Sequence, residues 1–278
     1  MSAQKEIVIG VLALQGAFEE HQECIEKGTG CKTIQVRTPK QLENIDGIIF
    51  PGGESTAMGL IGSVGGMWTA LKDFTQSGKP TWGTCAGMIL LAERCVGGSA
   101  VIENGQSLIG GLDILVCRNY FGSQISSFEM ATPCPPGHEE GGDYPGVFIR
   151  APAILNVGVD VEVLGKVVAT PCRQAAVVLR ELEIKIARGE NVVMMGVVDA
   201  LERKDGLKYV DVKKDTTRSG VEMEKIELPG AADGTNAREV ICAARKNNLL
   251  ITAFHPEITQ DYRWHKYFYD MVKDSVNN

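Results

Sequence analysis

The first 95 residues alternate short apolar runs with segments of helical periodicity, and this alternation constrains the fold more than any other feature of the chain. Strands are predicted where apolar runs are bounded by turn residues, at 7–14, 33–37, 47–50 and 80–83. Helices are predicted over residues 17–27, 67–76 and 86–93. Strands that alternate with helices pair in parallel, because each helix returns the chain to the same edge of the sheet. We therefore predict an α/β fold with a mostly parallel central sheet that is flanked by helices.

The pattern changes after Gly97, where short runs separated by Gly and Pro are typical of antiparallel strands. Such antiparallel additions are predicted at 108–119, 127–130 and 147–150. Near the end of the chain, residues 239–244 and 249–254 flank a polar turn at 245–248, which predicts a β-hairpin. A last helix is predicted over residues 261–273.

Residues 171–238 interrupt this pattern. The second half of the segment is highly charged, and it ends in a run of Pro, Gly, Ala and Asp at 229–234. This composition is typical of a surface segment rather than of core. At about 150 residues per domain, 278 residues allow one domain or two. We predict a single domain over residues 1–278, with residues 171–238 as a surface insertion packed at its edge.

Composition and charge exclude several classes of protein. Lys and Arg number 28 against 35 Asp and Glu, a net charge of −7, and no long basic run offers the footprint that a phosphate backbone needs, so we expect no nucleic-acid partner. No apolar stretch reaches the roughly 18 residues that cross a bilayer, so no membrane partner is expected. The eight cysteines are irregularly spaced and lack zinc-ligand spacing, so we expect no metal site and a reducing compartment such as the cytosol.

Residues 83–87, Gly-Thr-Cys-Ala-Gly, have the form of a nucleophile elbow, a tight strand-to-helix turn whose small neighbours lift the central side chain above the sheet. The central residue is Cys85. The positive end of the following helix stabilises a thiolate, and the backbone N–H of Ala86 is an oxyanion donor at the same turn. The alternative is a buried cysteine that packs as a small apolar side chain.

His255 and Glu257 follow the apolar run 249–254, so they lie just past a strand end, where functional side chains gather. Residues two apart in an extended segment point the same way, and Pro256 favours an extended backbone. The carboxylate could then orient the imidazole and stabilise its charge, which would complete a set of nucleophile, base and orienting group with Cys85. Taken alone, the pair is equally compatible with a coincidence on the surface.

Residues 51–56, Pro-Gly-Gly-Glu-Ser-Thr, directly follow the predicted strand 47–50. The two glycines leave the backbone free to turn its N–H groups toward a ligand oxygen, and Glu54 could hold an amine. A plain turn that caps the next helix through Ser55 or Thr56 is an alternative, and so is a phosphate-binding nest.

The remaining histidines and two apolar groups are assigned no functional role. His21 and His265 fall in the first and last predicted helices and His138 falls in a loop, so solvated or packed side chains are expected. Core packing is expected for Trp264, Tyr267, Phe268 and Met271, which share helical spacing, and for Met194 and Met195.

Taken together, the glycine turn, the cysteine elbow and the late His-Pro-Glu resemble the class I, triad-type glutamine amidotransferases. More narrowly, the chain is similar to the glutaminase subunits of pyridoxal 5′-phosphate synthase over residues 6–170 and 239–273. Seven segments carry this resemblance in the same order: 12–16, 51–56, 83–91, 118–122, 127–129, 147–152 and 254–258. The resemblance implies the flavodoxin-like fold of that family. It offers nothing for residues 171–238, and the loop 133–144 is unusually rich in Pro, Gly and acidic residues.

The resemblance implies hydrolysis of L-glutamine to glutamate and ammonia, with Cys85 as nucleophile, His255 as general acid and base, and Glu257 as the group that orients the imidazole. It also implies an oxyanion hole formed by the N–H groups of Gly53 and Ala86. The residues that it places around bound glutamine are Gly53, Glu54, Ser55, Arg118, Ile149 and Arg150. A guanidinium fork matches a carboxylate, which suits the two arginines to the substrate.

The resemblance further implies a hetero-oligomer in which ammonia passes to a pyridoxal 5′-phosphate synthase subunit. No cofactor is expected in this chain, because pyridoxal phosphate is the product of the partner. One rival is the glutaminase of another amidotransferase, such as imidazole glycerol phosphate synthase, and another is a cysteine hydrolase of the stress-protein or intracellular-protease type. A catalytically silent subunit that only binds glutamine or a partner is the alternative from a different class. The segments around Arg118 and Arg150 favour the vitamin pathway.

Overall fold

The computed structural model describes residues 5–97, 108–122, 127–190, 192–196, 207–210, 215–216, 222–223, 227–232 and 235–277. The strands are β1 (Val8–Leu12), β2 (Lys32–Val36), β3 (Gly47–Phe50), β4 (Thr81–Thr84), β5 (Ala92–Val96), β6 (Leu112–Cys117), β7 (Phe128–Thr132), β8 (Tyr144–Phe148), β9 (Ala153–Val157), β10 (Glu162–Ala169), β11 (Val192–Gly196), β12 (Leu207–Val210), β13 (Asp215–Thr216), β14 (Glu222–Met223), β15 (Arg238–Lys246) and β16 (Leu249–Thr252). The helices are α1 (Phe18–Thr29), α2 (Ser55–Gly62), α3 (Met67–Gln76), α4 (Ala86–Leu91), α5 (Arg173–Arg188) and α6 (Arg263–Asn277), with 3₁₀ helices η1 (Pro39–Asn44) and η4 (Pro256–Ile258).

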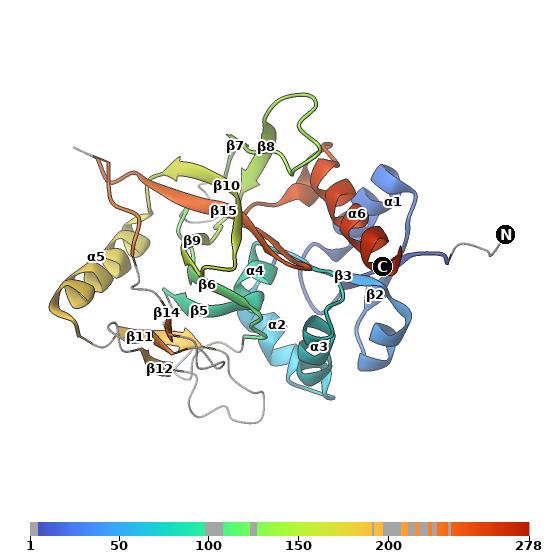
Figure 1. The fold of residues 1–278 in the computed structure, drawn as a ribbon, viewed down its shortest axis with the longest axis horizontal. Coiled ribbons are helices and arrows are strands. Elements are labelled where there is room, and N and C mark those ends of the chain that lie inside the picture. The colour runs from blue at the N-terminus through green and yellow to red at the C-terminus, as the bar shows by residue number, and fades with distance from the viewer. Residues whose placement is uncertain are drawn as a thin grey trace.

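Parallel strands form one side of the large main sheet, which confirms the predicted fold class (Figure 1). These strands follow the order β16-β4-β3-β1-β2, and each pair of neighbours is parallel. Strand β3 is buried along its whole length, and both β3 and α3 have the predicted bounds. A strand that is covered on both faces has a continuous apolar sequence, so its signal is unambiguous.

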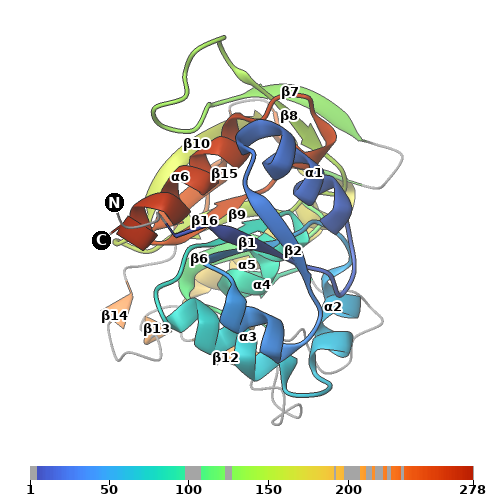
Figure 2. The same ribbon diagram turned by 90° about the vertical axis from the view of Figure 1, so that its right-hand side faces the viewer.

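Helices cover both faces of the parallel sheet (Figure 2). Helices α1 and α6 lie together on one face, and α2, α3 and α4 lie on the other. The approach of α4 depends on glycine, because a Cβ on Gly87 would lie 2.0 Å from the carbonyl oxygen of Phe50 in β3. The last helix buries the apolar stripe Trp264, Tyr267, Phe268 and Met271, as predicted. This packing places the start of α4 against the C-terminal ends of β3 and β4.

The second half of the molecule adds mainly antiparallel strands. Strand β15 pairs in antiparallel fashion with β16, β9 and β10, and β6 pairs with β9 in the same way. The hairpin turn is shorter than predicted, because β15 continues to Lys246 and Asn247 turns the chain with a φ of 52°. Strands β7 and β8 form a separate antiparallel pair. The antiparallel additions are confirmed, although β9 and β10 were not predicted.

The predicted helix 86–93 is wrong at its end. Helix α4 stops at Leu91, and β5 begins at Ala92 and pairs in parallel with β6. Residues 92, 95 and 96 are buried in that pairing, so tertiary hydrogen bonding decides a segment whose local pattern continues the helix.

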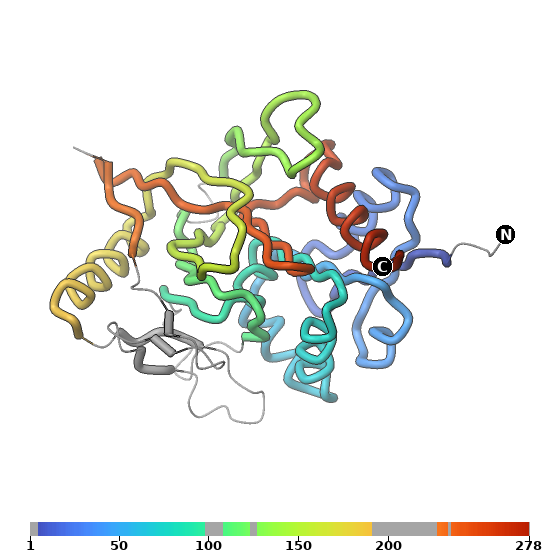
Figure 3. Tube along the Cα trace, in the orientation of Figure 1, coloured from blue at the N-terminus to red at the C-terminus, as the bar shows by residue number. Residues whose placement is uncertain are grey.

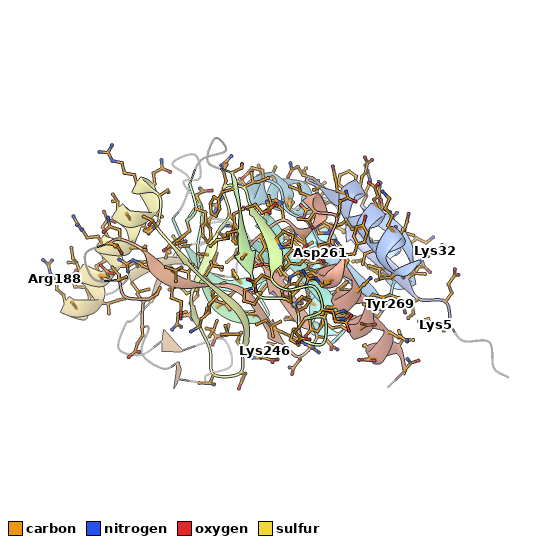
Figure 4. The ribbon with its side chains drawn as sticks, turned by 90° about the horizontal axis from the view of Figure 1, so that it is seen from above. Lys5, Lys32, Arg188, Lys246, Asp261 and Tyr269 are labelled. Atoms are coloured by element: carbon orange, nitrogen blue, oxygen red, sulfur yellow. The ribbon has the colours of Figure 1, made fainter. Side chains whose placement is uncertain are left out.

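The segment 171–238 is only partly a surface insertion. Helix α5 buries one face, formed by Ala175, Leu179 and Leu182, in the hydrophobic core, which corrects the expectation of a surface segment. Beyond it, β11 pairs with β5 and so extends the main sheet at its edge. Figure 3 shows α5 at the end of the molecule opposite the two termini. In Figure 4, Arg188 of α5 and Lys32 of β2 mark opposite ends of the long axis. The predicted packing of Met194 and Met195 and the charged runs from residue 202 to 226 lie outside the described side chains.

Candidate active site

Cys85 occupies the turn between β4 and α4, with φ 46° and ψ −100°. Residues other than glycine rarely adopt this conformation, which costs about 1–3 kcal/mol. The turn depends on small neighbours, because a Cβ on Gly83 would lie 2.6 Å from the backbone of Gly87. The Cys85 N–H donates to the Thr252 carbonyl over 2.9 Å, which ties the turn to the end of β16. The elbow is therefore formed and held by the neighbouring strand.

His255 and Glu257 follow β16, which pairs in parallel with β4 so that Thr252 lies opposite Thr84. The end of β16 therefore brings both residues to the elbow. The His255 Nδ1 and Glu257 Oε1 atoms are 2.7 Å apart. The extended backbone predicted here is wrong, because residues 256–258 form η4 with proline at its first position. The carboxylate meets the imidazole through this tight turn rather than along a strand.

The His255 imidazole has a second neighbour, the side chain of Cys85, which lies with it against Gly52 and acts on its pKa. Burial lowers the pKa of His255, but the negative charges of Cys85 and Glu257 together outweigh burial and raise this pKa well above 6.5. Burial raises the pKa of Glu257, and the neighbouring His21 and His255 outweigh it, so the pKa of this carboxyl lies below its ordinary value. The arrangement favours a protonated His255 beside an ionised Glu257 carboxylate.

Gly52 lies against both His255 and Cys85. A Cβ at this position would lie 2.4 Å from Cε1 and 2.7 Å from Nδ1 of the imidazole, and 3.4 Å from the Cβ of Cys85. A side chain of any size would thus occupy the space of the His255 ring. The glycine turn predicted from the sequence is therefore one wall of the site.

The glycine turn is held by residues 15–17, which follow β1. The Ala17 N–H donates to the Gly52 carbonyl over 3.1 Å. Because a trans peptide holds its C=O and N–H antiparallel, the Gly53 N–H points away from Ala17. The Glu54 N–H donates to the Gln15 side-chain oxygen over 2.6 Å. Gln15 was not singled out as a site residue, although it lies in one of the segments that carry the family resemblance.

Glu54 has a role that was not predicted. Its carboxylate accepts hydrogen bonds from the Thr56 and Ala57 N–H groups at 3.2 and 2.7 Å, and so forms the N-cap of α2. This excludes the alternative that Ser55 or Thr56 caps the helix, and it occupies both carboxylate oxygens that could otherwise hold an amine. Ser55 itself is 3% exposed and faces the guanidinium described next.

Arg118 follows β6 and is 7% exposed. Its Nη2 donates to Ser55 Oγ over 3.3 Å and lies 3.9 Å from Glu54 Oε1. Among the described residues, its Nε and Nη1 atoms have no hydrogen-bond partner. A buried guanidinium with free donors is costly unless an anion satisfies it, so this side chain is suited to hold a carboxylate.

Ile149 and Arg150 lie just past β8, whose Val147 carbonyl accepts from the His255 N–H over 2.8 Å. Strand β8 therefore delivers both residues to the neighbourhood of the imidazole. Arg150 is exposed and has a φ of 48°. Within the described part of the chain, no hydrogen bond joins either side chain to Cys85, His255 or Glu257, so their contact with a substrate stays a prediction. Ala86 is the first residue of α4.

Three histidines were assigned no role, and the structure gathers two of them behind Glu257. His21 and His265 are fully buried, and their rings are 3.0 Å apart between Nδ1 and Nε2. His21 Nε2 lies 3.4 Å from Glu257 Oε2. His138 lies elsewhere, beside Asp270. No sequence signal joins residues 244 positions apart, so only the packing of α1 on α6 could find this cluster.

The described residues contain no group of three or more His, Cys, Asp or Glu side chains that could hold a metal ion. None of their helices is long and apolar enough to cross a membrane. All eight cysteines are free thiols.

Comparison with known proteins gives a consistent result. The model of the SNO glutamine amidotransferase family matches residues 11–186. "Probable pyridoxal 5'-phosphate synthase subunit PDX2" of Arabidopsis thaliana is 40% identical over 271 residues, which cover 96% of this chain and 87% of that protein. "Pyridoxal 5'-phosphate synthase subunit PdxT" of Dehalococcoides mccartyi is 35% identical over 266 residues, covering 96% of this chain and 97% of its own length.

The solved structures agree with the sequence relatives. A crystal structure described as a glutamine amidotransferase superposes with a TM-score of 0.61 at 28% identity, covering 95% of this chain and 98% of that one. These findings confirm the resemblance stated from the motifs. The chain belongs to the SNO glutamine amidotransferase family.

Proposed function

We propose that the protein is a glutaminase that hydrolyses L-glutamine to L-glutamate and ammonia, with Cys85 as its nucleophile. The observation that carries this proposal is the strained elbow of Cys85 beside the His255 imidazole, which in turn lies 2.7 Å from Glu257. A nucleophile, a base and an orienting carboxylate in this order are the components of covalent acyl transfer. Family membership supports amide chemistry for the same residues.

The first half of the reaction forms a thioester. The Cys85 sulfur attacks the side-chain amide carbon of glutamine, and the N–H groups of Gly53 and Ala86 hold the resulting oxyanion. The position of Ala86 at the start of α4 supports its part, because the first N–H groups of a helix have no partner within it. The imidazolium of His255 then donates its proton to the departing nitrogen, and ammonia leaves.

The second half of the reaction releases glutamate. Neutral His255 takes a proton from water, which attacks the thioester carbon, and the thiolate of Cys85 leaves. Glu257 keeps the imidazole oriented through Nδ1 and stabilises its positive charge. The raised pKa of His255 supports this cycle, because the imidazolium needed for ammonia departure is then present at neutral pH.

Arg118 is proposed to hold the carboxylate of the substrate. Its two unpartnered nitrogens and its burial support this role, since a bound carboxylate would satisfy both. Ser55 orients the guanidinium from the other side. We propose further contacts from Gly53 and Glu54 and from Ile149 and Arg150 past β8, as the family resemblance implies.

We further propose that ammonia passes to a pyridoxal 5′-phosphate synthase subunit in a hetero-oligomer, in a reducing compartment such as the cytosol. The names of the relatives at 40% and 35% identity, which cover nearly all of this chain, support this partner over imidazole glycerol phosphate synthase. The same names disfavour a cysteine hydrolase of the intracellular-protease type. The presence of Cys85, His255 and Glu257 in one cluster disfavours a silent subunit.

The proposal is tested by measuring glutamate release from L-glutamine by the purified chain, alone and with the synthase subunit, with Cys85→Ala as control. We expect release that rises with the partner and is lost in the variant. Release that does not depend on the partner would keep the glutaminase and contradict the expected increase with the partner. No release in either condition would favour a silent subunit, and release by Cys85→Ala would remove the nucleophile assignment.

A further inference from the structure

A buried polar cluster lies behind the carboxylate of Glu257, on the face of the sheet that α1 and α6 cover (Figure 2). It consists of His21 from α1, His265 from α6 and Thr84 from the end of β4, each 0% exposed. The two imidazoles pack edge to face against Trp82, with ring centroids 5.6 and 5.0 Å from the indole. Polar groups in such a position are costly unless they are bonded to one another.

The contacts join the cluster to both parts of the proposed site. His21 Nε2 lies 3.1 Å from Thr84 Oγ1 and 3.4 Å from Glu257 Oε2. Thr84 precedes the nucleophile in the chain, and the opposite carboxylate oxygen of Glu257 contacts His255. On its other side, His21 Nδ1 lies 3.0 Å from His265 Nε2. His21 therefore touches the base of the elbow and the far side of the carboxylate at once.

Chemistry selects one proton arrangement for this chain of contacts. A carboxylate repels the lone pair of a neutral ring nitrogen and attracts an N–H, so Nε2 of His21 carries the proton. Its Nδ1 is then an acceptor, and His265 must donate from Nε2. The remaining nitrogen of His265, Nδ1, has no partner in the described structure. It is then an unprotonated acceptor, which costs less to bury alone than an N–H donor.

Both imidazoles are neutral at physiological pH. Burial lowers the pKa of His21 more than Glu257 raises it, and burial with the adjacent His21 lowers the pKa of His265 well below 6.5. A neutral His21 holds Glu257 without cancelling its charge. A second imidazolium there would compete with His255 for the same carboxylate.

We propose that His21, held in a single tautomer by His265, is a positioning residue: its Nε2 faces the outer oxygen of Glu257 at 3.4 Å, an oxygen with no hydrogen-bond partner among the described residues, and thereby orients the carboxylate toward His255. This inference rests on the proposed glutaminase reaction. Helix α1 supports the same strand end a second time, because the Cys24 thiol donates to the Glu257 carbonyl over 3.6 Å. Helix α1 thus contacts Glu257 through two of its side chains, on the side away from His255.

The test compares His21→Leu with His21→Gln. Glutamine places an amide N–H near the position of Nε2, whereas leucine keeps bulk and removes the donor. His138→Leu is the matched control, since it removes an imidazole that faces a carboxylate, Asp270, outside the site. With the synthase subunit present, we expect His21→Leu to lower kcat for glutamate release by about 10- to 100-fold at nearly unchanged KM. We expect His21→Gln to recover most of kcat, and His138→Leu to match the wild type.

A second readout does not depend on glutamine turnover. The rate at which iodoacetamide alkylates Cys85, followed by mass spectrometry of its peptide, reports the ionisation of the Cys85 and His255 pair across pH. Without His21 the Glu257 carboxylate is held less firmly against His255 and stabilises the imidazolium less, so the step assigned to His255 moves to lower pH by about 0.5 to 1 unit in His21→Leu. The charged or titratable groups that face His21 are Glu257, His255, His265 and Glu20. None of them is changed in this variant.

The outcomes separate the two proposals. If the wild type releases no glutamate but the alkylation step still moves in His21→Leu, the glutaminase fails and the positioning role stands. If the wild type is active and His21→Leu keeps its kcat with the alkylation step unmoved, the positioning role is wrong. If His21→Leu and His21→Gln lose kcat equally and the pH step of Cys85 alkylation does not move in either, His21 has only a packing role. Thermal unfolding of all variants shows whether each one is folded.

Discussion

Gly52→Ala is the sharpest test of the site geometry, because the change adds one methyl group and nothing else. Gly52 does not have the positive φ that would make alanine strained by itself. The added Cβ would lie 2.4 Å from Cε1 of His255, about 1 Å inside the 3.4 Å at which ordinary contact begins. The imidazole must therefore move by roughly that distance or the glycine turn must open.

The expected effect follows from this displacement. Moving the imidazole by about 1 Å breaks its 2.7 Å contact with Glu257 and shifts it relative to Cys85. Misplacement of a catalytic group by about 1 Å costs about 100-fold in rate, equivalent to about 2.7 kcal/mol of transition-state stabilisation. We expect kcat to fall by that factor, while the fold survives because the change adds a single methyl group.

The assay is glutamate release with the synthase subunit at saturating glutamine, together with thermal unfolding of the same preparations. Gly230→Ala is the matched control, because a Cβ there meets no atom within 4 Å and its φ is not positive. The control should leave kcat and the midpoint of unfolding unchanged. A Gly52→Ala variant with kcat within twofold of the wild type would refute the reasoning that His255 fills this space.

Four other predictions use the same preparations. Cys85→Ala and Cys85→Gly should both abolish glutamate release. The glycine variant should have a free energy of unfolding about 1 kcal/mol higher than the alanine variant, since only glycine adopts φ 46° and ψ −100° without strain. Equal stability of the two variants in denaturant titrations would contradict the strain. Glu257→Gln should lower kcat more than it raises KM, because the carboxylate stabilises the imidazolium and touches no substrate; steady-state kinetics showing a change confined to KM would remove that role. Lowering the pH below about 6.5 should destabilise the fold, because the unfolded chain then takes up protons at His21 and His265 that the folded chain resists. The stability from these two groups is present above that pH and is lost as the pH falls. The double variant His21→Gln/His265→Leu should show a weaker pH dependence of its unfolding midpoint. Arg118→Met should raise KM for glutamine and also stabilise the free chain by about 1 kcal/mol, because it removes a buried guanidinium with two unsatisfied nitrogens; a lower unfolding midpoint together with unchanged KM would argue against a substrate contact.

Local signals determined the first half of the fold and the parts of the site that lie at strand ends. Strand β3 and helix α3 are short, apolar or amphipathic segments with clear turn residues on both sides, so their bounds could be predicted from the sequence. The elbow around Cys85 is equally local, because its glycines and its neighbours are adjacent in the chain. The fate of residues 92–96 and 173–182 was not local. Residues 92–96 are compatible with a helix or a strand until β6 pairs with them. Residues 173–182 are compatible with a surface helix or a core helix until the main core packs against them.

Tertiary structure decided how those strand ends meet. The sequence by itself determined that Cys85, His255 and Glu257 each follow a buried strand, since period and turn residues are properties of a short window. It did not determine the 3₁₀ turn that joins the last two, or the guanidinium of Arg118 against Ser55, 63 positions away. The contact of His21 with His265 spans 244 positions. Such contacts depend on the packing of whole layers, because only burial between α1, α6 and β4 makes two ordinary helix histidines neutral, joins them to each other and places one of them beside a carboxylate.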